Sequence, residues 1–436
     1  NYFFILNGDD DPTTYLYDSY YDYMPFSYNG HNIRLQPEIS LPYGYPAGGF
    51  YISYMCSETS AVEMDRRAWN SYLNPDATLV ISSGTNHYTV IREGFTSVDI
   101  DPYTADPLFV WHSVVEDDNS YDCSMTYDNF HLTGGTGYWK QPFIVIDNPE
   151  VSEELTGHDD NEFIWPIVMI GDSPLEDHRR VHIYGNNYTS NPGGGWGYNT
   201  LYGYADFNAD SLLYESEFDW TYRTFPYFDD MHYNDTGRSN KDMVVKGNKV
   251  AFFGSFTDGD SLFCMYSDDY GENFTLYSQE WLYPVENPLQ EDGTPEFYNN
   301  DEITPSEMYF TLSYDGSHFN GAFTDNDTKI VWMTLINLNN LENMDTGYYM
   351  PAYQWPKIFM FDIETGTFSF YDMDIQGADP ADDQPMIPWD LDEDGEVDEF
   401  YDAGSVYIPL GMCSWFYNSD QGYQDAFYHE NNFKMT

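Results

Sequence analysis

One short pattern recurs along the chain: a run of apolar and aromatic residues followed by a polar turn. With one apolar residue of each copy as a marker, the copies lie at Phe50, Leu108, Val181, Val250, Ile330 and Val406. Neighbouring markers are between 58 residues (Phe50 to Leu108) and 80 residues (Val250 to Ile330) apart. Self-similarity at such a spacing indicates a repeat architecture in which each copy is one supersecondary unit.

The composition indicates that these units are built from β-strands. Aromatic residues make up 19% of the chain, and they favour half-buried pleated surfaces. Some copies are followed by further aromatic strands and a tight turn, as at 357–371, where Gly366 stands at the turn. About four strands per unit and about six units predict an all-β chain folded as a β-propeller. Two β-sandwich domains in tandem are the alternative, because regular strands alone do not distinguish the two.

One segment is more specific than the repeat itself. Residues 267–274 place Ser267, Asp269, Gly271 and Phe274 in the order Ser-x-Asp-x-Gly-x-x-aromatic. The segment resembles the Asp-box of sialidase-like propellers, and the texture of the chain is similar to that of propeller-containing surface proteins of secreting bacteria. We expect the Asp carboxylate to accept backbone N–H groups and the Gly to adopt a positive φ. The aromatic ring should pack between sheets. In that family the Asp-box is structural, so these residues are not catalytic candidates.

The charge balance excludes several partners. The chain carries 74 Asp and Glu against 15 Lys and Arg, a formal net charge of −59. Nucleic acid is excluded as a partner because phosphate binding needs clustered Lys and Arg. No apolar run approaches the ~20 residues of a membrane helix, so no membrane insertion is expected. Divalent cations or basic partners fit this charge better.

The beginning of the chain also bears on its location. Residues 1–30 contain the acidic run 9–11 and are expected to form an N-terminal segment ahead of a propeller domain over 31–436. No signal peptide is recognisable there, so we expect either an intracellular protein or a mature form that has lost its leader. The acidic, Tyr-rich composition favours the second, with an extracellular or cell-surface location.

The sharpest chemical signal is an acidic loop at 390–398. Its candidate Ca²⁺ ligands are Asp390, Asp392, Asp394, Glu396 and Asp398. Their spacing reproduces the start of an EF-hand loop, in which alternate carboxylates converge on one hard cation and a Gly makes the sharp turn. The usual bidentate Glu at the twelfth position is missing. A solvated acidic turn is the alternative interpretation.

A second candidate calcium loop follows residue 205. Its ligands would be Asp206, Asn208, Asp210 and Glu217. The oxygen-bearing side chains fit Ca²⁺, but a Ser replaces the Gly, and the same pattern suits an Asx-rich hairpin turn.

Neither the cysteines nor the arginines define a catalytic site. The four cysteines are far apart and form no CxxC, so buried thiols are favoured over zinc or disulfides. A sialidase-like enzyme would use three Arg and a Tyr–Glu pair. Only eight Arg occur, and the alternative in which they neutralise local acids is favoured.

Two functional hypotheses follow. The first is a secreted, calcium-binding, non-enzymatic propeller that binds a glycan or a protein at the cell surface, or assembles with copies of itself into a layer or filament. Loop Tyr and Trp suit sugar stacking and subunit contacts. The alternative is a secreted glycan-active hydrolase of sialidase-like architecture. The sequence alone favours the non-enzymatic hypothesis slightly.

Overall fold

The computed structural model describes part of the chain. The described residues are 27–35, 50–57, 66–73, 79–84, 90–101, 107–115, 121–127, 144–146, 164–190, 196–208, 218–225, 241–255, 261–280, 283–284, 308–312, 320–324, 326–340 and 349–372. In these segments every regular element is a β-strand. None of them contains a helix long and apolar enough to cross a membrane.

The strands form antiparallel sheets in chain order. The first contains β1 (Ser27–Leu35), β2 (Phe50–Ser57), β3 (Arg66–Leu73) and β4 (Leu79–Gly84). The second contains β5 (Val90–Ile100), β6 (Pro107–Val115), β7 (Tyr121–Tyr127) and β8 (Ile144–Ile146). The third contains β9 (Ile164–Asp172), β10 (His178–Ser190), β11 (Trp196–Asn208) and β12 (Thr221–Thr224).

The fourth and fifth sheets continue the series. The fourth contains β13 (Lys241–Lys246), β14 (Lys249–Ser255), β15 (Ser261–Ser267) and β16 (Thr275–Glu280). The fifth is six-stranded: β17 (Tyr283–Pro284), β18 (Met308–Leu312), β19 (Asn320–Phe323), β20 (Lys329–Asn340), β21 (Tyr349–Asp362) and β22 (Thr367–Asp372). Both β18 and β19 pair with β20, along different parts of its length.

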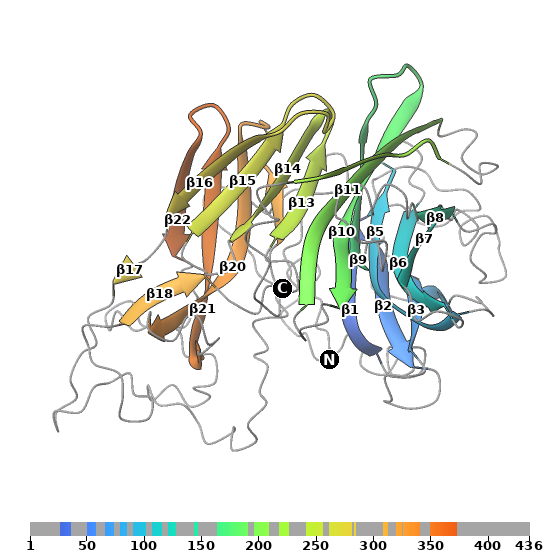
Figure 1. The fold of residues 1–436 in the computed structure, drawn as a ribbon, viewed down its shortest axis with the longest axis horizontal. Helices are drawn as coiled ribbons and strands as arrows, with labels where there is room; N and C mark the ends of the chain where they lie inside the picture. Colours follow the sequence, from blue (N-terminus) through green and yellow to red (C-terminus); the bar gives the residue numbers. More distant parts are fainter. Residues whose placement is uncertain are drawn as a thin grey trace.

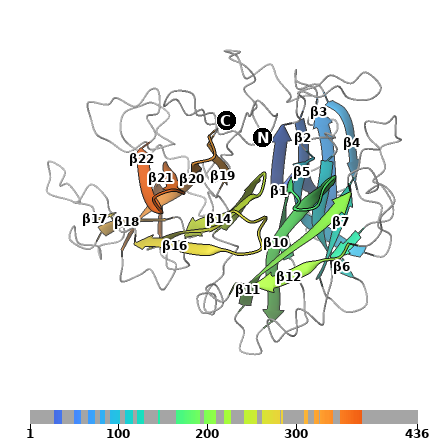
Figure 2. The same cartoon turned by 90° about the horizontal axis from the view of Figure 1, so that it is seen from above.

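Neighbouring sheets meet through their inner strands, which are the first strands of the second to fourth sheets and β19 of the fifth. β5 lies against β1 and β9, and β13 lies against β9 and β19. Figures 1 and 2 show the sheets standing side by side in chain order, from blue through green and yellow to orange. Four-stranded antiparallel sheets arranged radially about their first strands are the blades of a β-propeller. The predicted fold class is confirmed.

The repeated apolar run is the second strand of each of the first four sheets, and in the fifth sheet it is β20, the strand after β19. The first five markers lie in β2, β6, β10, β14 and β20. The described residues form five sheets. The sixth marker, Val406, and the N-terminal segment 1–26 lie outside these residues, so the prediction of about six blades and the division at residue 30 both stay predictions.

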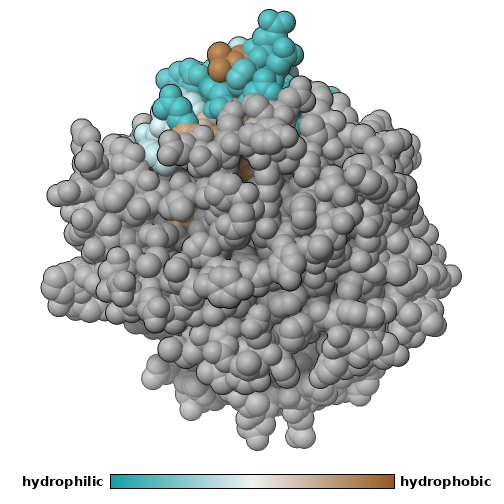
Figure 3. All heavy atoms as spheres, turned by 90° about the vertical axis from the view of Figure 1, so that its right-hand side faces the viewer, coloured by the Kyte–Doolittle hydropathy of each residue, from teal (hydrophilic) through white to brown (hydrophobic). Residues whose placement is uncertain are grey.

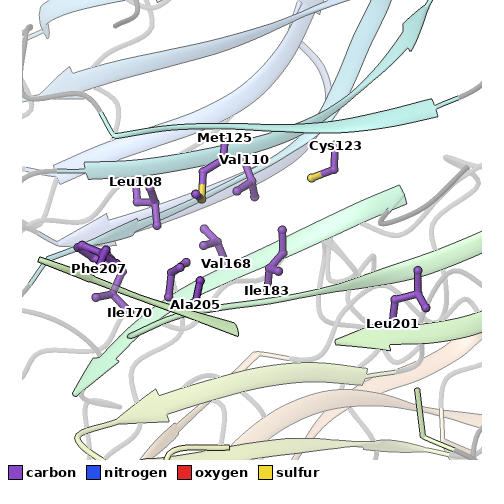
Figure 4. Close-up of a cluster of buried hydrophobic side chains, with 11 residues drawn as sticks. Leu108, Val110, Cys123, Met125, Val168, Ile170, Ile183, Leu201, Ala205 and Phe207 are labelled. Atoms are coloured by element: carbon purple, nitrogen blue, oxygen red, sulfur yellow. The ribbon is translucent and has the colours of Figure 1, made fainter. Parts of the chain in front are cut away.

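Separate apolar cores fill the three spaces between the second and fifth sheets. Between the second and third sheets, β6 and β7 contribute residues such as Val110 and Met125, which face Val168, Ile183 and Phe207 (Figure 4). Equivalent clusters lie between the third and fourth sheets and between the fourth and fifth. A blade in the middle of the series is thus buried on both faces.

This double burial explains the continuous apolar runs in the sequence. On β13, Met243 and Val245 belong to the core shared with the third sheet, whereas Val244 belongs to the core shared with the fifth. Because successive strand residues point to opposite faces, a strand buried on both sides needs apolar residues at every position. Cys123 and Cys264 occupy such core positions as buried thiols, as expected.

The turns that follow the first strands gather at one end of the propeller, called here the turn end. Asp101, just after β5, pairs with Arg179 of β10 at 3.4 Å. The Asp172 N–H at the end of β9 donates to the Gly247 carbonyl after β13 (2.9 Å). Lys246 reaches Asp327, between β19 and β20, at 2.9 Å. The beginnings of β5, β9 and β13 therefore lie at the opposite end.

Figure 3 shows one face of the molecule, where the coloured residues at the top are mostly hydrophilic around a small hydrophobic spot. Large apolar side chains exposed among the described residues are Leu175 and Phe370.

Candidate functional site

The segment that resembles an Asp-box joins β15 to β16 at the turn end. The Asp269 carboxylate accepts the Asn273 N–H (2.9 Å) and the Ser267 hydroxyl (2.7 Å). The Ser267 Oγ in turn accepts the Gly271 N–H at 3.0 Å. Burial alone would raise the pKa of Asp269, but the hydrogen bonds from Asn273 and Ser267 outweigh it and lower that pKa. The expected role of the Asp is confirmed.

Gly271 and Phe274 fix this hairpin against the third blade. Gly271 has φ 79°, and a Cβ at this position would run into the hydroxyl of Tyr202 on β11. The Phe274 ring packs edge-on against Tyr202 and against Phe225, with centroids 5.5 and 5.3 Å away. It also contacts Phe252 of its own sheet. The aromatic residue of the motif therefore does pack between sheets.

A buried arginine connects the same hairpin to the third blade. Arg180 of β10 is 3% exposed and makes two hydrogen bonds to the Asp206 carboxylate, at 2.8 and 2.6 Å. It also reaches Glu272 (3.2 Å), and its guanidinium lies 4.2 Å from the centre of the Tyr204 ring. Burial raises the pKa of Asp206 taken alone, but the hydrogen bonds from Arg180 and Ser173 lower it overall. Through Glu272, Arg180 links the third blade to the fourth. Removing one partner of the Arg180–Asp206 pair would leave the other charge buried and unpaired, which is strongly destabilising.

A second buried polar pair lies beside it. The His182 Nδ1 and the Tyr202 hydroxyl are 2.7 Å apart, and both side chains are fully buried. Burial, followed by the positive charge of Arg180, lowers the pKa of His182 to about 3. Burial likewise raises the pKa of Tyr202. Both groups are therefore neutral at physiological pH.

Three arginines at the turn end are partners of local acids and carbonyls. Arg179 pairs with Asp101, Arg180 with Asp206, and Arg223 donates to the Glu272 carbonyl. These three guanidiniums thus form ion pairs or hydrogen bonds between or within blades. These contacts at the turn end are consequently structural.

The innermost strand β5 carries carboxylates toward both neighbouring blades. Glu93 is completely buried, and its Oε2 accepts the Ala68 N–H of the first sheet (3.2 Å). Asp99 accepts the Ile170 N–H of the third sheet at 2.7 Å. Two residues six positions apart would normally share a face. Pairing between β5 and β6 shifts register between Gly94 and Ser97, and this bulge turns Glu93 and Asp99 to opposite sides.

Two inner-strand carboxylates lie near the end opposite the turns. Glu93 is the fourth residue of β5, and Asp242 is the second residue of β13. Asp242 is half-buried and accepts the Met243 N–H at 2.8 Å. Sequence reasoning missed both residues, because acidic residues are so numerous in this chain that neither position stands out.

The predicted calcium ligands fall largely outside the described residues. The loop with Asp390, Asp392, Asp394, Glu396 and Asp398 does so entirely, as do Asp210 and Glu217.

Two ligands of the second loop are described. Asp206 lies in β11 with its oxygens bonded to Arg180 and Ser173, and Asn208 ends that strand. Within the described part of the chain, no three His, Cys, Asp or Glu side chains form a metal-binding group. Both loops stay predictions.

Comparison with known proteins gives matches to solved structures alone. No protein-family model and no curated protein matches the sequence. A sialidase from Streptococcus pneumoniae is 10% identical, with 83% of this chain and 64% of that chain covered and a TM-score of 0.39. A GH43 enzyme from Xanthomonas citri is 12% identical, with 77% and 90% covered and a TM-score of 0.35. A GH43 β-1,3-galactosidase is 10% identical, with 81% and 97% covered and a TM-score of 0.33. At these values the likeness assigns no residue a role.

One expectation is corrected by these matches. We expected a non-enzymatic propeller for extracellular binding or surface assembly, but the matched propellers are glycoside hydrolases. The sequence could not weigh the hydrolase alternative, because among 74 acidic residues it singles out no carboxylate pair, and the separation of two carboxylates in space decides a glycosidase mechanism. The alternative, a glycan-active hydrolase, is therefore taken up below as a proposal.

Proposed function

We propose that this protein is a glycan-active hydrolase whose reaction takes place at the end of the propeller where the inner strands begin. The observation that carries the proposal is the position of Glu93 and Asp242, two carboxylates near the first residues of inner strands. Inner strands converge on the propeller axis. Hydrolysis of a glycosidic bond generally uses two carboxyl groups, one on each side of the bond.

The two carboxylates differ in a way that suits two roles. Glu93 is removed from water, whereas Asp242 is half-exposed. In glycosidases a carboxyl in a water-poor environment is suited to protonate the leaving oxygen, and a more solvated one stays ionised as base or nucleophile. Glu93 is therefore the candidate acid and Asp242 the candidate partner.

The charge of the chain favours a neutral glycan over an anionic one. A net charge of −59 repels sialic and uronic acids, which lowers their local concentration near the protein. The described arginines at the turn end are engaged with acids and carbonyls. The resemblance to sialidases therefore concerns the propeller architecture and not the anionic substrate. The proposed substrate is a neutral glycan outside the cell or on its surface.

We also propose that Ca²⁺ binds the 390–398 loop, since crowded carboxylates repel one another without a cation. Of the two candidate loops this one is preferred, because the oxygens of Asp206 in the other are engaged by Arg180 and Ser173.

The test of the hydrolase proposal compares Glu93→Gln and Asp242→Asn with wild type on a panel of neutral oligosaccharides and aryl glycosides. Glu364→Gln is the matched control, because Glu364 is exposed in the turn between β21 and β22. We expect the first two variants to lose at least ~100-fold in kcat, in line with the usual contribution of general acid–base catalysis, and to keep the wild-type melting temperature within a few degrees. Full activity in either variant would remove that residue from the proposed pair.

A further inference from the structure

We propose that Asn326 is an acceptor site for an N-linked glycan. Asn326, Asp327 and Thr328 form an Asn-x-Thr sequence, which marks a surface loop suited to such a modification when the middle residue is not Pro. The same pattern occurs at Asn187, Asn234 and Asn273. The inference concerns a modification of the chain itself and does not depend on the proposed hydrolase activity.

The side chain of Asn326 is exposed and oriented for this reaction. Its Oδ1 accepts the Thr328 hydroxyl at 2.7 Å, the Thr328 N–H at 3.3 Å and the Thr324 hydroxyl at 2.9 Å. A backbone N–H can only donate, so the atom that faces Thr328 must be the carbonyl oxygen. The amide nitrogen, which is the reacting atom, consequently points away from the turn toward solvent.

The turn that presents Asn326 is well fixed. The Asp327 N–H donates to the Thr324 carbonyl (2.8 Å), and the Thr324 N–H donates to the Lys329 carbonyl (2.9 Å). Lys246 of the neighbouring blade pairs with the Asp327 carboxylate at 2.9 Å. The Thr328 hydroxyl and the Asn326 amide that it orients are therefore already held together before a transferase binds.

The sequence motif at Asn273 has the opposite geometry. Its amide nitrogen donates to Asp269 Oδ2 at 2.6 Å, inside the Asp-box. A sugar on that nitrogen would disturb the hydrogen bonds that close the β15–β16 hairpin. Asn187 lies within β10, opposite Asn199 of β11, and Asn234 is outside the described residues. Asn326 is thus the described site best arranged for transfer.

The reaction needs a polyisoprenyl-diphosphate-linked oligosaccharide as co-substrate. The Asn326 amide nitrogen forms a bond to C1 of the first sugar, and the bond between C1 and the diphosphate oxygen breaks. The lipid diphosphate leaves, and the amide proton passes to a base of the transferase. Asn326 lies in the turn between β19 and β20, so the glycan would project from the turn end, away from Glu93 and Asp242.

The test has two arms with peptide mapping by mass spectrometry as the readout. In one, folded protein made in a host without the transferase is incubated with purified oligosaccharyltransferase and its lipid-linked oligosaccharide; in the other, the chain is secreted from a eukaryotic host. We expect a glycan on Asn326 and at least tenfold lower occupancy at Asn273. Asn326→Asp, which keeps the accepting oxygen but lacks the nitrogen, and Thr328→Val should abolish modification at this site, whereas Thr328→Ser and Asn273→Gln should retain it. Unmodified Asn326 in both arms, or equal occupancy at Asn273, would overturn the proposal.

Discussion

Replacing Gly271 by Ala should destabilise the protein through two separable effects. The left-handed conformation of Gly271 (φ 79°) costs an L-residue about 1–2 kcal/mol. The added methyl group would also collide with the Tyr202 hydroxyl, and forcing a methyl into a packed core costs about 1–3 kcal/mol more. The free energy of unfolding should therefore fall by about 2–5 kcal/mol.

A double-mutant cycle separates these two effects. Tyr202→Phe removes the hydroxyl and its hydrogen bond to the fully buried His182, at a cost of about 1–3 kcal/mol. In that background Gly271→Ala should cost only the backbone part, about 1–2 kcal/mol. Gly247→Ala is the matched control, because Gly247 has φ 60° but its nearest neighbour, Asp172 Oδ2, is 3.5 Å from the methyl position.

The assay is urea unfolding followed by tryptophan fluorescence, with each variant compared at the same protein concentration. A coupling free energy of about 1–3 kcal/mol between positions 202 and 271 is expected. Strictly additive costs would refute the proposed collision with the Tyr202 hydroxyl. A loss below about 0.5 kcal/mol for Gly271→Ala would also refute the backbone argument.

Three further predictions concern pH and calcium. Because the pKa of Asp206 is lowered in the folded state, its contribution to stability is present above the pKa of the unfolded chain and is lost as the pH falls below about 4. Asp206→Asn should flatten the acid limb of a plot of unfolding free energy against pH. The pKa of His182 falls to about 3 on folding, so between pH 6.5 and 3 the unfolded chain binds a proton that the folded chain does not. As the pH falls through this range, the free energy of unfolding should decrease by up to about 1.4 kcal/mol per pH unit, and His182→Gln should reduce that slope. An unchanged slope would contradict the lowered pKa of His182. Removing Ca²⁺ with a chelator should lower the melting temperature, and Asp392→Asn with Asp394→Asn should abolish that response; a melt insensitive to chelation would remove the metal proposal.

Much of the fold follows from local patterns in the sequence. The continuous apolar runs around Val181 and Val250 predict strands. The structure explains why these runs are continuous, since both faces of each strand are buried. The turn at 363–366 carries a Gly because its φ is 67°. Patterns of this kind involve residues within one strand or hairpin, so they can be recognised without knowing what lies opposite.

The arrangement of the polar groups could not be predicted in the same way. Arg180 and Glu272 are 92 positions apart and meet only because the third and fourth blades are neighbours. The side on which Glu93 lies depends on the bulge after Gly94, a one-residue shift that leaves no signal in composition or spacing. Asp206 has a sequence context typical of a calcium ligand, yet its oxygens are bonded to Arg180 and Ser173, which lie close to it only in the folded sheet.

The most direct test of the central claim is hydrolysis in H₂¹⁸O, followed by mass spectrometry of the products. A neutral oligosaccharide incubated with the protein should yield shorter fragments that carry one ¹⁸O at each new reducing end. The Glu93→Gln variant should give at least ~100-fold less labelled product at the same folded concentration. If no labelled fragment appears from any glycan of a broad panel, neutral or anionic, while the protein is folded and calcium-loaded, this protein is not a glycan hydrolase.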